Sequence, residues 1–337
     1  MSSQQWFPIT DSFLREVIAP LEETLEGRIH KNVSLSQISR WKIGGNAWCV
    51  VDAASSSDIS NVFRLMRSRS EPVFIMGDSS NVLFDTRGFN GLILRISRSM
   101  SSVRTSGSTM VAQAGVWMPY LARRSAQEGL SGLEHAVGIP GTLGGLVLMN
   151  GGSQRLGIGN NVLRVQCVTF NGEDMTLSRD DCNFSYRKSS LQFQRLAVVE
   201  VQLELTPADP SIIRRDMINI LRSRRTRFPK NLPNGGSTFL SDPTMYSSVG
   251  APGAIIERIG FKGLREGGAQ ISTQHANFIV NNGGATSFDV LRLVYLIRQR
   301  VQDVTGFRLD CEVQHVRFDG VVAPAHVAAH EHFELLR

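Results

Sequence analysis

The chain has 337 residues, of which 42% are hydrophobic and 20% charged, and its formal net charge is +6. This composition excludes a disordered chain and a fibrous repeat, and the length predicts two or three domains. No apolar run approaches the roughly 20 residues that span a bilayer. The first residues, Met1 to Trp6, lack the basic and apolar segments of a secretion signal. We therefore expect a cytoplasmic protein with no membrane insertion.

The positive charge and the cysteines indicate which kinds of ligand the protein is expected to bind. The densest basic cluster, residues 222–227, is accompanied by no aromatic-rich sheet motif or helix-turn-helix pattern, so small anionic ligands are favoured over nucleic acid. Four cysteines lie far apart without a C-x-x-C pair, which predicts buried thiols in a reducing compartment and neither a disulfide framework nor a metal site. They are Cys49, Cys167, Cys182 and Cys311.

Periodic patterns in the first third of the chain predict a small α/β lobe. A helix is expected to begin after its N-cap Thr10, with Phe13 and Val17 on its apolar face, and to be interrupted by Pro20. Strands and one helix with short crossovers follow. They are the strand 48–51, the helix 58–67 and the strands 73–76 and 92–96.

The remaining elements predict a second lobe and a C-terminal domain. A hairpin turns at residues 106–108 and another at Asn171-Gly172-Glu173. The further elements are a helix 118–128, a strand 197–205, a helix 211–224, a helix 253–259, a strand 278–280, a helix 288–304 and a strand 308–316. A loose tail is expected from Pro324, whose histidines are interpreted as solvated and not as metal ligands. The expected divisions are 1–97, 98–224, 225–322 and 323–337.

Glycine-rich turns are the strongest local feature. From Gly138 to Gly152, six of fifteen residues are glycine. Such a turn, opening into a helix, aims backbone N–H groups at an anion, although a packing turn in an α/β core is the alternative. Two similar turns upstream favour a long, phosphate-bearing cofactor. The predicted cofactor-binding residues are Ile43, Gly44, Gly45, Gly77, Asp78, Ser79, Ser80, Asn81, Gly138, Ile139, Pro140, Gly141, Thr142, Gly144 and Gly145.

Three side chains are candidates for chemistry, each with an ordinary alternative. Ser237 follows two glycines, where serine is commonly a turn residue. Arg187, in the run Tyr-Arg-Lys-Ser, has a guanidinium fork suited to a carboxylate, yet most arginines are surface cations. Glu312 lies opposite the apolar face of an alternating strand, where a carboxylate commonly faces solvent. A partial dinucleotide fingerprint at 157–162 lacks its third glycine and opens a strand, so we discount it.

Taken together, the motifs closely resemble the UDP-N-acetylenolpyruvoylglucosamine reductases (UDP-N-acetylmuramate dehydrogenases), flavin enzymes of peptidoglycan precursor synthesis. The matching segments run in family order over about residues 34–316: Trp41–Gly45, Gly77–Leu83, Gly88–Gly91, Gly138–Gly145, Met149–Gly152, Tyr186–Ser189, Gly236–Phe239, Gly268–Ser272, His275–Ile279 and Glu312–Val313. The resemblance implies an α+β protein with an FAD-binding fold of the vanillyl-alcohol-oxidase (PCMH) type in two α/β lobes, plus a C-terminal α+β substrate domain. The spacing between Arg187 and Ser237 resembles the short-loop subtype.

The same resemblance implies an oxidoreductase that uses FAD and NADPH and acts on a UDP-sugar, as a monomer or weak oligomer. Reduced flavin would deliver hydride to the enol-ether double bond of the substrate. Arg187 and Glu312, the latter protonated or acting through hydrogen bonds, would stabilise the negative charge, and Ser237 would donate a proton as general acid. Residues implied to bind substrate are Tyr186, Asn150, Gln270 and Asn277.

Three departures from the family pattern affect the substrate half. The family's usual Phe-Lys-x-Pro is Phe239-Leu240-Ser241-Asp242-Pro243 here, so a cation suited to the substrate diphosphate is missing. The segments 150–155 and 245–252 also differ. One alternative is therefore a paralogous flavoenzyme acting on a different nucleotide sugar or a secondary metabolite. Another is a catalytically silent flavin- or nucleotide-binding module.

Overall fold

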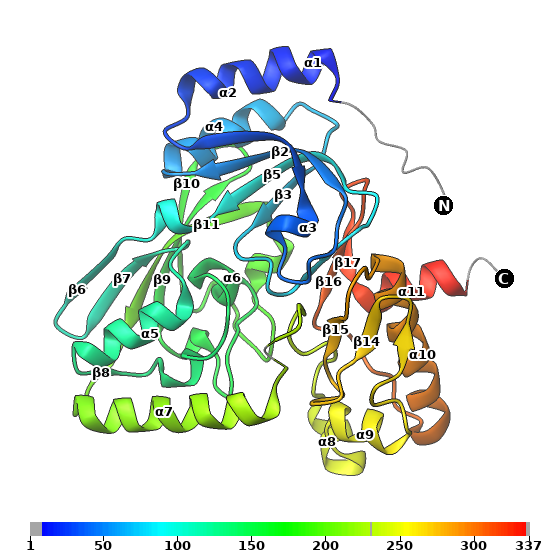
Figure 1. Ribbon diagram of the computed structural model, residues 1–337. Coiled ribbons are helices and arrows are strands. Elements are labelled where there is room, and N and C mark those ends of the chain that lie inside the picture. Colours follow the sequence, from blue (N-terminus) through cyan, green and yellow to red (C-terminus); the bar gives the residue numbers. More distant parts are fainter. Residues whose placement is uncertain (1–8, 230, 335–337) are drawn as a thin grey trace.

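The computed structural model describes residues 9–229 and 231–334. The start of the chain, on which the expectation of no secretion signal rests, lies outside these residues. Two lobes and a C-terminal domain are arranged around the centre of the molecule (Figure 1). Within the described residues, no helix is long and apolar enough to cross a membrane. All four cysteines are buried and free.

Lobe 1 is built on a four-stranded sheet of order β1-β2-β5-β3. Strands β2, β5 and β3 run parallel to one another, and β1 is antiparallel to β2. The strands are β1 (Arg28–Ser34), β2 (Asn46–Ala53), β3 (Val73–Met76) and β5 (Phe89–Ile96). Helix α4 (Ser56–Met66) begins after its N-cap Ser55 and buries Ile59, Val62 and Phe63, and a short helix α3 (Leu35–Ile38) follows β1. The predicted α/β lobe is confirmed.

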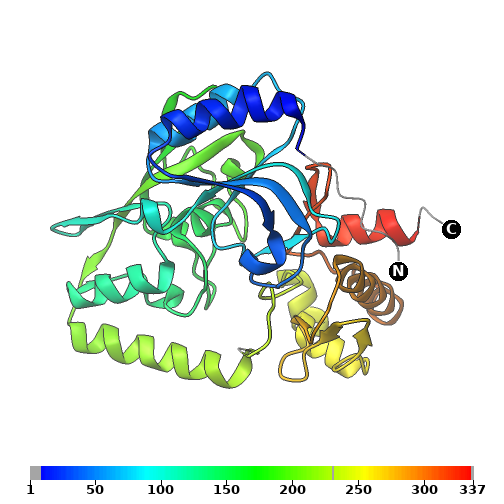
Figure 2. The same ribbon diagram turned by 45° about the horizontal axis from the view of Figure 1, so that its top comes forward.

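The N-terminal helix continues past the proline that was expected to interrupt it. Helix α1 (Asp11–Phe13), a π-helical turn (Leu14–Ile18) and α2 (Ala19–Thr24) follow one another without a break, over the same side of lobe 1 as α4 (Figure 2). The predicted N-cap is confirmed, since Thr10 accepts from the N–H of Phe13. The predicted interruption at Pro20 is wrong. In the π-helical turn immediately before the proline, backbone hydrogen bonds join residues five apart instead of four, and the proline itself has no N–H to donate.

Lobe 2 is a five-stranded antiparallel sheet of order β10-β9-β11-β7-β6. Both predicted hairpins are confirmed. The strands are β6 (Val103–Ser106), β7 (Thr109–Gln113), β9 (Val162–Thr169), β10 (Asp174–Ser178) and β11 (Leu196–Glu204), and a short pair joins β8 (Leu130–Ser131) to β12 (Thr206–Pro207). The helices are α5 (Met118–Gln127), α6 (Leu143–Leu148) and α7 (Pro210–Arg227). Helix α7 therefore crosses the boundary expected at residue 224.

The C-terminal domain has a hydrophobic core that it shares with Trp41, Ile43 and Leu83 of lobe 1. Its longest helix, α10 (Ser287–Thr305), begins with a capping box of Thr286 and Asp289 and ends at Gly306, whose φ is 76°. The helix packs on a three-stranded sheet β13-β14-β15. Its other elements are α8 (Pro243–Val249), which was not predicted, α9 (Pro252–Arg258), β13 (Arg265–Glu266), β14 (Ala269–Ile271) and β15 (Ile279–Asn281).

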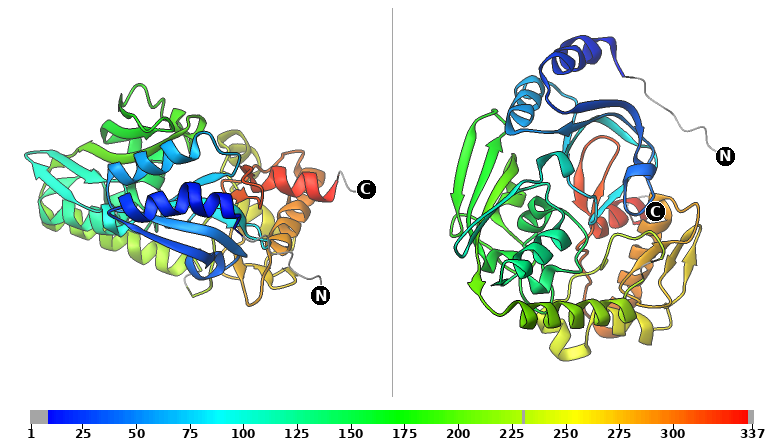
Figure 3. Two further views of the ribbon diagram at one scale, coloured as in Figure 1. Left: turned by 90° about the horizontal axis from the view of Figure 1, so that it is seen from above. Right: turned by 60° about the vertical axis from the view of Figure 1, so that its left-hand side comes forward.

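The chain returns to lobe 1 near its end. Strand β16 (Gln314–Val316) pairs in parallel with β4 (Val82–Phe84) of lobe 1 and antiparallel with β17 (Val322–Pro324), a hairpin drawn in red against the blue strands in Figure 3. The predicted strand 308–316 is thus too long. Residues 309, 311 and 313 are buried as the alternation predicted, but among the described residues that part is paired only by the bridge from Phe239 to Cys311.

The predicted loose tail is wrong over the residues described. Helix α11 (Ala325–Phe333) packs against α10 through small buried residues, Ala325, Ala328 and Ala329. His326 accepts from the backbone N–H of Cys311 at 2.9 Å, which ties the helix to the segment before Glu312. The sequence concealed this helix because alanine, unlike leucine or valine, gives little periodic apolar signal. No group of candidate metal ligands occurs among the residues described.

Replacing Ala325 with aspartate should destabilise the protein strongly. Ala325 is fully buried and its N–H donates to the carbonyl of Val313. An unpaired buried carboxylate lowers the free energy of unfolding by about 3–5 kcal/mol. Urea unfolding measures the change. Val321→Asp, at an exposed position just before β17, is the matched control and should change stability by less than about 0.5 kcal/mol. Equal effects would contradict the docked position of α11.

Candidate functional site

Two of the predicted cofactor turns face each other between the lobes. The turn 77–81 follows β3, and the turn 138–142 leads into α6, whose N-cap Thr142 accepts from Gly145. A Cβ atom on Gly77 would lie 2.3 Å from Thr142 Oγ1, and one on Gly141 would lie 2.9 Å from Ser80 Oγ. The close approach of the two turns therefore requires glycine at both positions.

These turns present unused hydrogen-bond donors. In the part of the chain that the structure describes, the backbone N–H groups of Asp78, Ser79, Ser80 and Gly141 donate to no protein acceptor. The φ values of Ser79 and Gly141 are 52° and 139°, which bring neighbouring N–H groups toward a common point. Clustered N–H groups of this kind bind phosphate oxygens. The two turns thus fit the diphosphate of the expected cofactor.

The third predicted turn is different. Ile43 donates its N–H to Ser39 Oγ and Gly45 donates to the carbonyl of Asp85, so both groups are already used within lobe 1. A Cβ atom on Gly44 would approach the Leu35 side chain to 2.7 Å. The described contacts of this turn are therefore packing contacts.

Two of the three predicted catalytic residues are in direct contact, and the third lies in an adjoining segment. Arg187 Nε lies 3.1 Å from Glu312 Oε1, and Arg187 Nη2 donates to the carbonyl of Gly152 at 2.7 Å. The backbone N–H of Glu312 donates to the carbonyl of Thr238, the residue next to Ser237, at 2.9 Å. The guanidinium and the carboxyl group therefore lie next to the segment that carries Ser237.

A tight turn aims Arg187 at this group. Ser185 and Lys188 exchange backbone hydrogen bonds around it, and Arg187 has a φ of 57°, a conformation that is uncommon for a residue with a side chain. Asn150 fixes the turn from outside, because its Nδ2 donates to the carbonyl of Ser185 and its Oδ1 accepts from Gly159. Backbone strain of this kind concentrates at functional sites.

The turn 77–81 also holds Glu312 in place. Asn81 Nδ2 donates to the carbonyl of Glu312 at 3.0 Å, and the N–H of Gln314 donates to the carbonyl of Asn81 at 3.0 Å. Both bonds continue the β4–β16 pairing. Glu312 is therefore positioned by lobe 1, although it follows the C-terminal domain in sequence.

The predicted substrate-binding residues separate into two groups. Asn277 is buried, and its side-chain amide both donates to and accepts from the backbone of Phe239; Gln270 donates to the carbonyl of Gly263. Like Asn150, they brace neighbouring segments. Tyr186 is instead 51% exposed, and its hydroxyl accepts from the N–H of Ser241 at 3.4 Å. It lies at the rim of the site.

Burial shifts the pKa values of two charged residues near the site, Glu312 and Arg224. Burial raises the pKa of Glu312, and the neighbouring Arg187 guanidinium opposes this shift. Burial, with Arg227 and Arg187 nearby, lowers the pKa of Arg224 to about 10. Arg224 lies over the Phe228 ring, and a Cβ atom on Gly138 would meet its Cδ at 2.5 Å. Sequence reasoning missed Arg224. Its only signal was the dense basic cluster at the end of α7.

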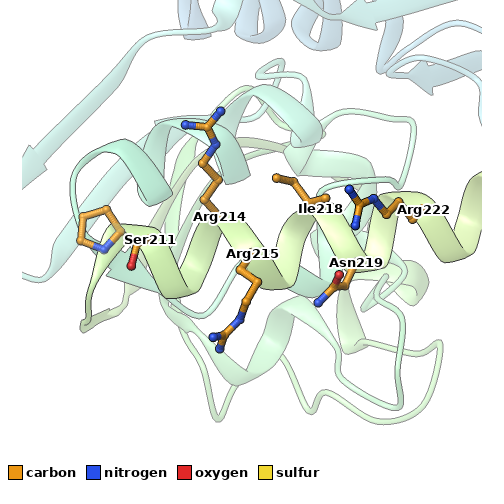
Figure 4. Close-up of a pocket in the computed structure, with 7 residues that line it drawn as sticks. Ser211, Arg214, Arg215, Ile218, Asn219 and Arg222 are labelled. Carbon is orange, nitrogen blue, oxygen red and sulfur yellow. The ribbon is translucent and has the colours of Figure 1, made fainter.

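A hollow of about 530 Å³ along the outer surface of α7 is unrelated to this group. Figure 4 shows its lining, including Arg214, Arg215, Ile218 and Arg222. The buried residues of α7 are Ile213, Met217 and Ile220, so the lining lies on the opposite side of the helix. None of the predicted site residues lines it.

Comparisons with known proteins agree with this geometry. Residues 47–178 match an FAD binding domain, and residues 228–316 match the C-terminal domain of UDP-N-acetylenolpyruvoylglucosamine reductase. UDP-N-acetylenolpyruvoylglucosamine reductase 1 of Corynebacterium glutamicum is 46% identical, over 92% of this chain and 93% of its own length. The chain belongs to the UDP-N-acetylenolpyruvoylglucosamine reductase family. The reductase of Heliobacterium modesticaldum is 37% identical, over 85% and 90% of the two chains.

A solved structure supports the same assignment. The crystal structure of UDP-N-acetylenolpyruvylglucosamine reductase from Thermus caldophilus superposes with a TM-score of 0.73 at 30% identity, over 86% of this chain and 99% of that chain. The expected α+β fold of the vanillyl-alcohol-oxidase type, with its FAD-binding lobes, is confirmed. Members of this reductase family are flavoproteins that use FAD and NADPH.

Proposed function

We propose that the protein reduces UDP-N-acetylenolpyruvoylglucosamine to UDP-N-acetylmuramate with NADPH, a step in peptidoglycan precursor synthesis. The observation that carries this proposal is the pair of Arg187 and Glu312, which lies next to the segment of Ser237 and beside two glycine turns with free N–H groups. FAD supplies the hydride chemistry that no side chain can provide. The residues that would hold its diphosphate are those of the turns 77–81 and 138–142, with Arg224 as the neighbouring cation.

Arg187 and Glu312 act on the charge that develops in the substrate. Arg187 donates toward the carboxylate side of the enolpyruvyl group, while Gly152 fixes the far end of its guanidinium. Glu312 has a raised pKa and donates a hydrogen bond in its protonated form. Donors positioned before the reaction stabilise the developing carboxylate-conjugated anion without reorganising. Ser237 then delivers a proton to the carbanionic carbon as general acid.

The supporting residues act through these three. Asn277 and Asn150 position the segments that carry Ser237 and Arg187, and Gln270 braces the small sheet behind them. We assign direct substrate contact to Tyr186, whose ring lies 5.5 Å from the Arg187 guanidinium. Four free thiols are compatible with a reducing cytoplasm, where the protein would work as a monomer or weak oligomer. Light scattering of the purified protein tests the last point.

Half-reaction measurements test the function. The purified protein should show flavin absorption, lose it on anaerobic addition of NADPH and regain it on addition of UDP-N-acetylenolpyruvoylglucosamine. Flavin that is reduced by NADPH but not reoxidised by this sugar would favour a paralogue with another substrate. Colourless protein that takes up no FAD would contradict every flavin function and leave the silent binding module.

The reoxidation rate should fall as the pH rises through the raised pKa of Glu312. The carboxyl retains its proton above the ordinary range of a glutamate and loses it at higher pH, so the donating form is depleted on the alkaline side. Glu312→Gln keeps an N–H donor and does not titrate, so its alkaline limb should be flatter. Stopped-flow reoxidation across pH measures both. The NADPH half-reaction of the same samples is the control. If the reoxidation rate of Glu312→Gln fell with rising pH as in the wild type, Glu312 would not be the donating group.

A further inference from the structure

Two segments that depart from the family pattern meet at the rim of the site. Arg155 belongs to the loop after α6, and its guanidinium lies over the ring of Tyr246, with 5.9 Å from Cζ to the ring centroid. Tyr246 belongs to α8, which begins directly after Leu240, Ser241 and Asp242. A second link joins the same two sides, because Tyr186 accepts from Ser241. The segments 150–155 and 240–252, which both depart from the family pattern, are therefore in contact with each other.

The loop adopts a strained conformation that directs Arg155 to this position. Gln154 and Arg155 have φ values of 56° and 64°, so two successive residues with side chains occupy the left-handed region. Residues other than glycine seldom do so, and they do so mainly where function requires it. The residues on either side of Gln154 and Arg155 are held by hydrogen bonds. Ser153 Oγ donates to the carbonyl of His135, and the N–H of Leu156 donates to the carbonyl of Ser153.

Arg155 keeps its charge available. No carboxylate pairs with its guanidinium among residues 9–229 and 231–334, whereas Arg187 is engaged by Glu312 and Gly152. Tyr246 is 50% exposed, so the contact lies at the surface of the rim and not in the core. An arginine stacked on an aromatic ring keeps its in-plane N–H donors free, and this fork matches the geometry of phosphate oxygens.

We propose that Arg155, held by Tyr246, binds the diphosphate of the nucleotide-sugar substrate and compensates for the missing cation at Leu240. The inference rests on the proposed function, because the reacting end of the substrate must reach Arg187 and Ser237 while its charged remainder extends along the rim. Both Leu240 and Tyr246 belong to one short stretch, which Ser241 joins to Tyr186, the neighbour of Arg187. Arg155 thereby determines which anionic tail the enzyme accepts.

Arg155→Gly is the decisive variant, because glycine adopts the φ of this position without strain and should leave the fold intact. Loss of a charge-assisted hydrogen bond should weaken binding of UDP-N-acetylenolpyruvoylglucosamine about 10- to 100-fold. Tyr246→Ala should weaken it less and Tyr246→Phe little. Arg164→Ala, on the exposed side of β9, is the matched arginine control with wild-type binding.

Adding Leu240→Lys to Arg155→Gly should restore most of the lost affinity, since it returns a cation to the same path. Equilibrium dialysis with UDP alone gives a second readout that requires no turnover, and its affinity should fall in Arg155→Gly as well. Unchanged affinity for UDP and for the sugar in Arg155→Gly would overturn the inference. If wild-type flavin were not reoxidised by the sugar, the proposed function would fail, and the UDP measurement would still decide the role of Arg155.

Discussion

Replacing Ser237 with alanine should slow the reoxidation of reduced flavin by UDP-N-acetylenolpyruvoylglucosamine about 100- to 10,000-fold, the range by which a positioned general acid accelerates a reaction. Ser237 follows Gly236, whose φ is 82°, and precedes Thr238, which is bonded to Glu312 and Asn277. The backbone on both sides of the hydroxyl is therefore fixed, and the substitution should remove only the proton donor. Stopped-flow absorbance after reduction with NADPH measures the rate.

Two comparisons make this test specific. The NADPH half-reaction of Ser237→Ala should proceed at the wild-type rate, because Ser237 acts only on the sugar. Ser211→Ala, at an exposed position at the start of α7, is the matched serine control and should leave both half-reactions unchanged. Wild-type reoxidation by Ser237→Ala would assign the proton to another group.

Gly141→Ala should yield protein that binds FAD about 5- to 150-fold more weakly and retains less flavin after purification. The φ of Gly141 is 139°, where a side chain is strained by about 1–3 kcal/mol, and the added methyl would also lie 2.9 Å from Ser80 Oγ. Each 1.36 kcal/mol corresponds to a factor of ten. The ratio of flavin to protein absorbance and a titration with FAD measure the loss.

The control for this prediction separates backbone strain from loss of the cofactor turn. Gly107 lies at the tip of the β6–β7 hairpin with a φ of 59°, and a methyl group there would meet nothing within 4 Å. Gly107→Ala should therefore lower stability slightly and keep its flavin. Full flavin content in Gly141→Ala would mean that the cofactor diphosphate is bound elsewhere.

Local patterns predicted the parts of this molecule that local physics determines. The hairpin at Asn171-Gly172 and the helix after Thr10 follow from turn and cap chemistry, which acts over a few residues. The grouping of Arg187, Ser237 and Glu312 came from the family resemblance. No periodicity in the sequence could bring together residues so far apart in the chain.

Long-range contacts account for what the sequence did not reveal. The pairing of β16 with β4 depends on two three-residue strands that have no recognisable pattern on their own. The docking of α11 depends on alanines, and the passage of the first helix through Pro20 depends on a π-helical turn. Asn277 stays a predicted substrate-binding residue from the family resemblance, and the hydrogen bonds of its amide to the backbone of Phe239 are a long-range contact that no local pattern predicts.

The attachment of Glu312 to Asn81 and β4 has a mechanical consequence. Ser237, at the entrance of the C-terminal domain, and Glu312, at its exit, are joined through Thr238, so both ends of that domain are fastened along one edge of lobe 1. The same domain is joined to lobe 1 at further points, because Trp41 Nε1 donates to the carbonyl of Ile279 and the hydroxyls of Thr86 and Ser287 are hydrogen-bonded. On the side of lobe 2, Tyr246 contacts Arg155 and Ser241 donates to Tyr186. The segments of Ser237 and Glu312 are therefore fixed to each other and to the turn 77–81 by contacts that do not depend on the rest of the C-terminal domain.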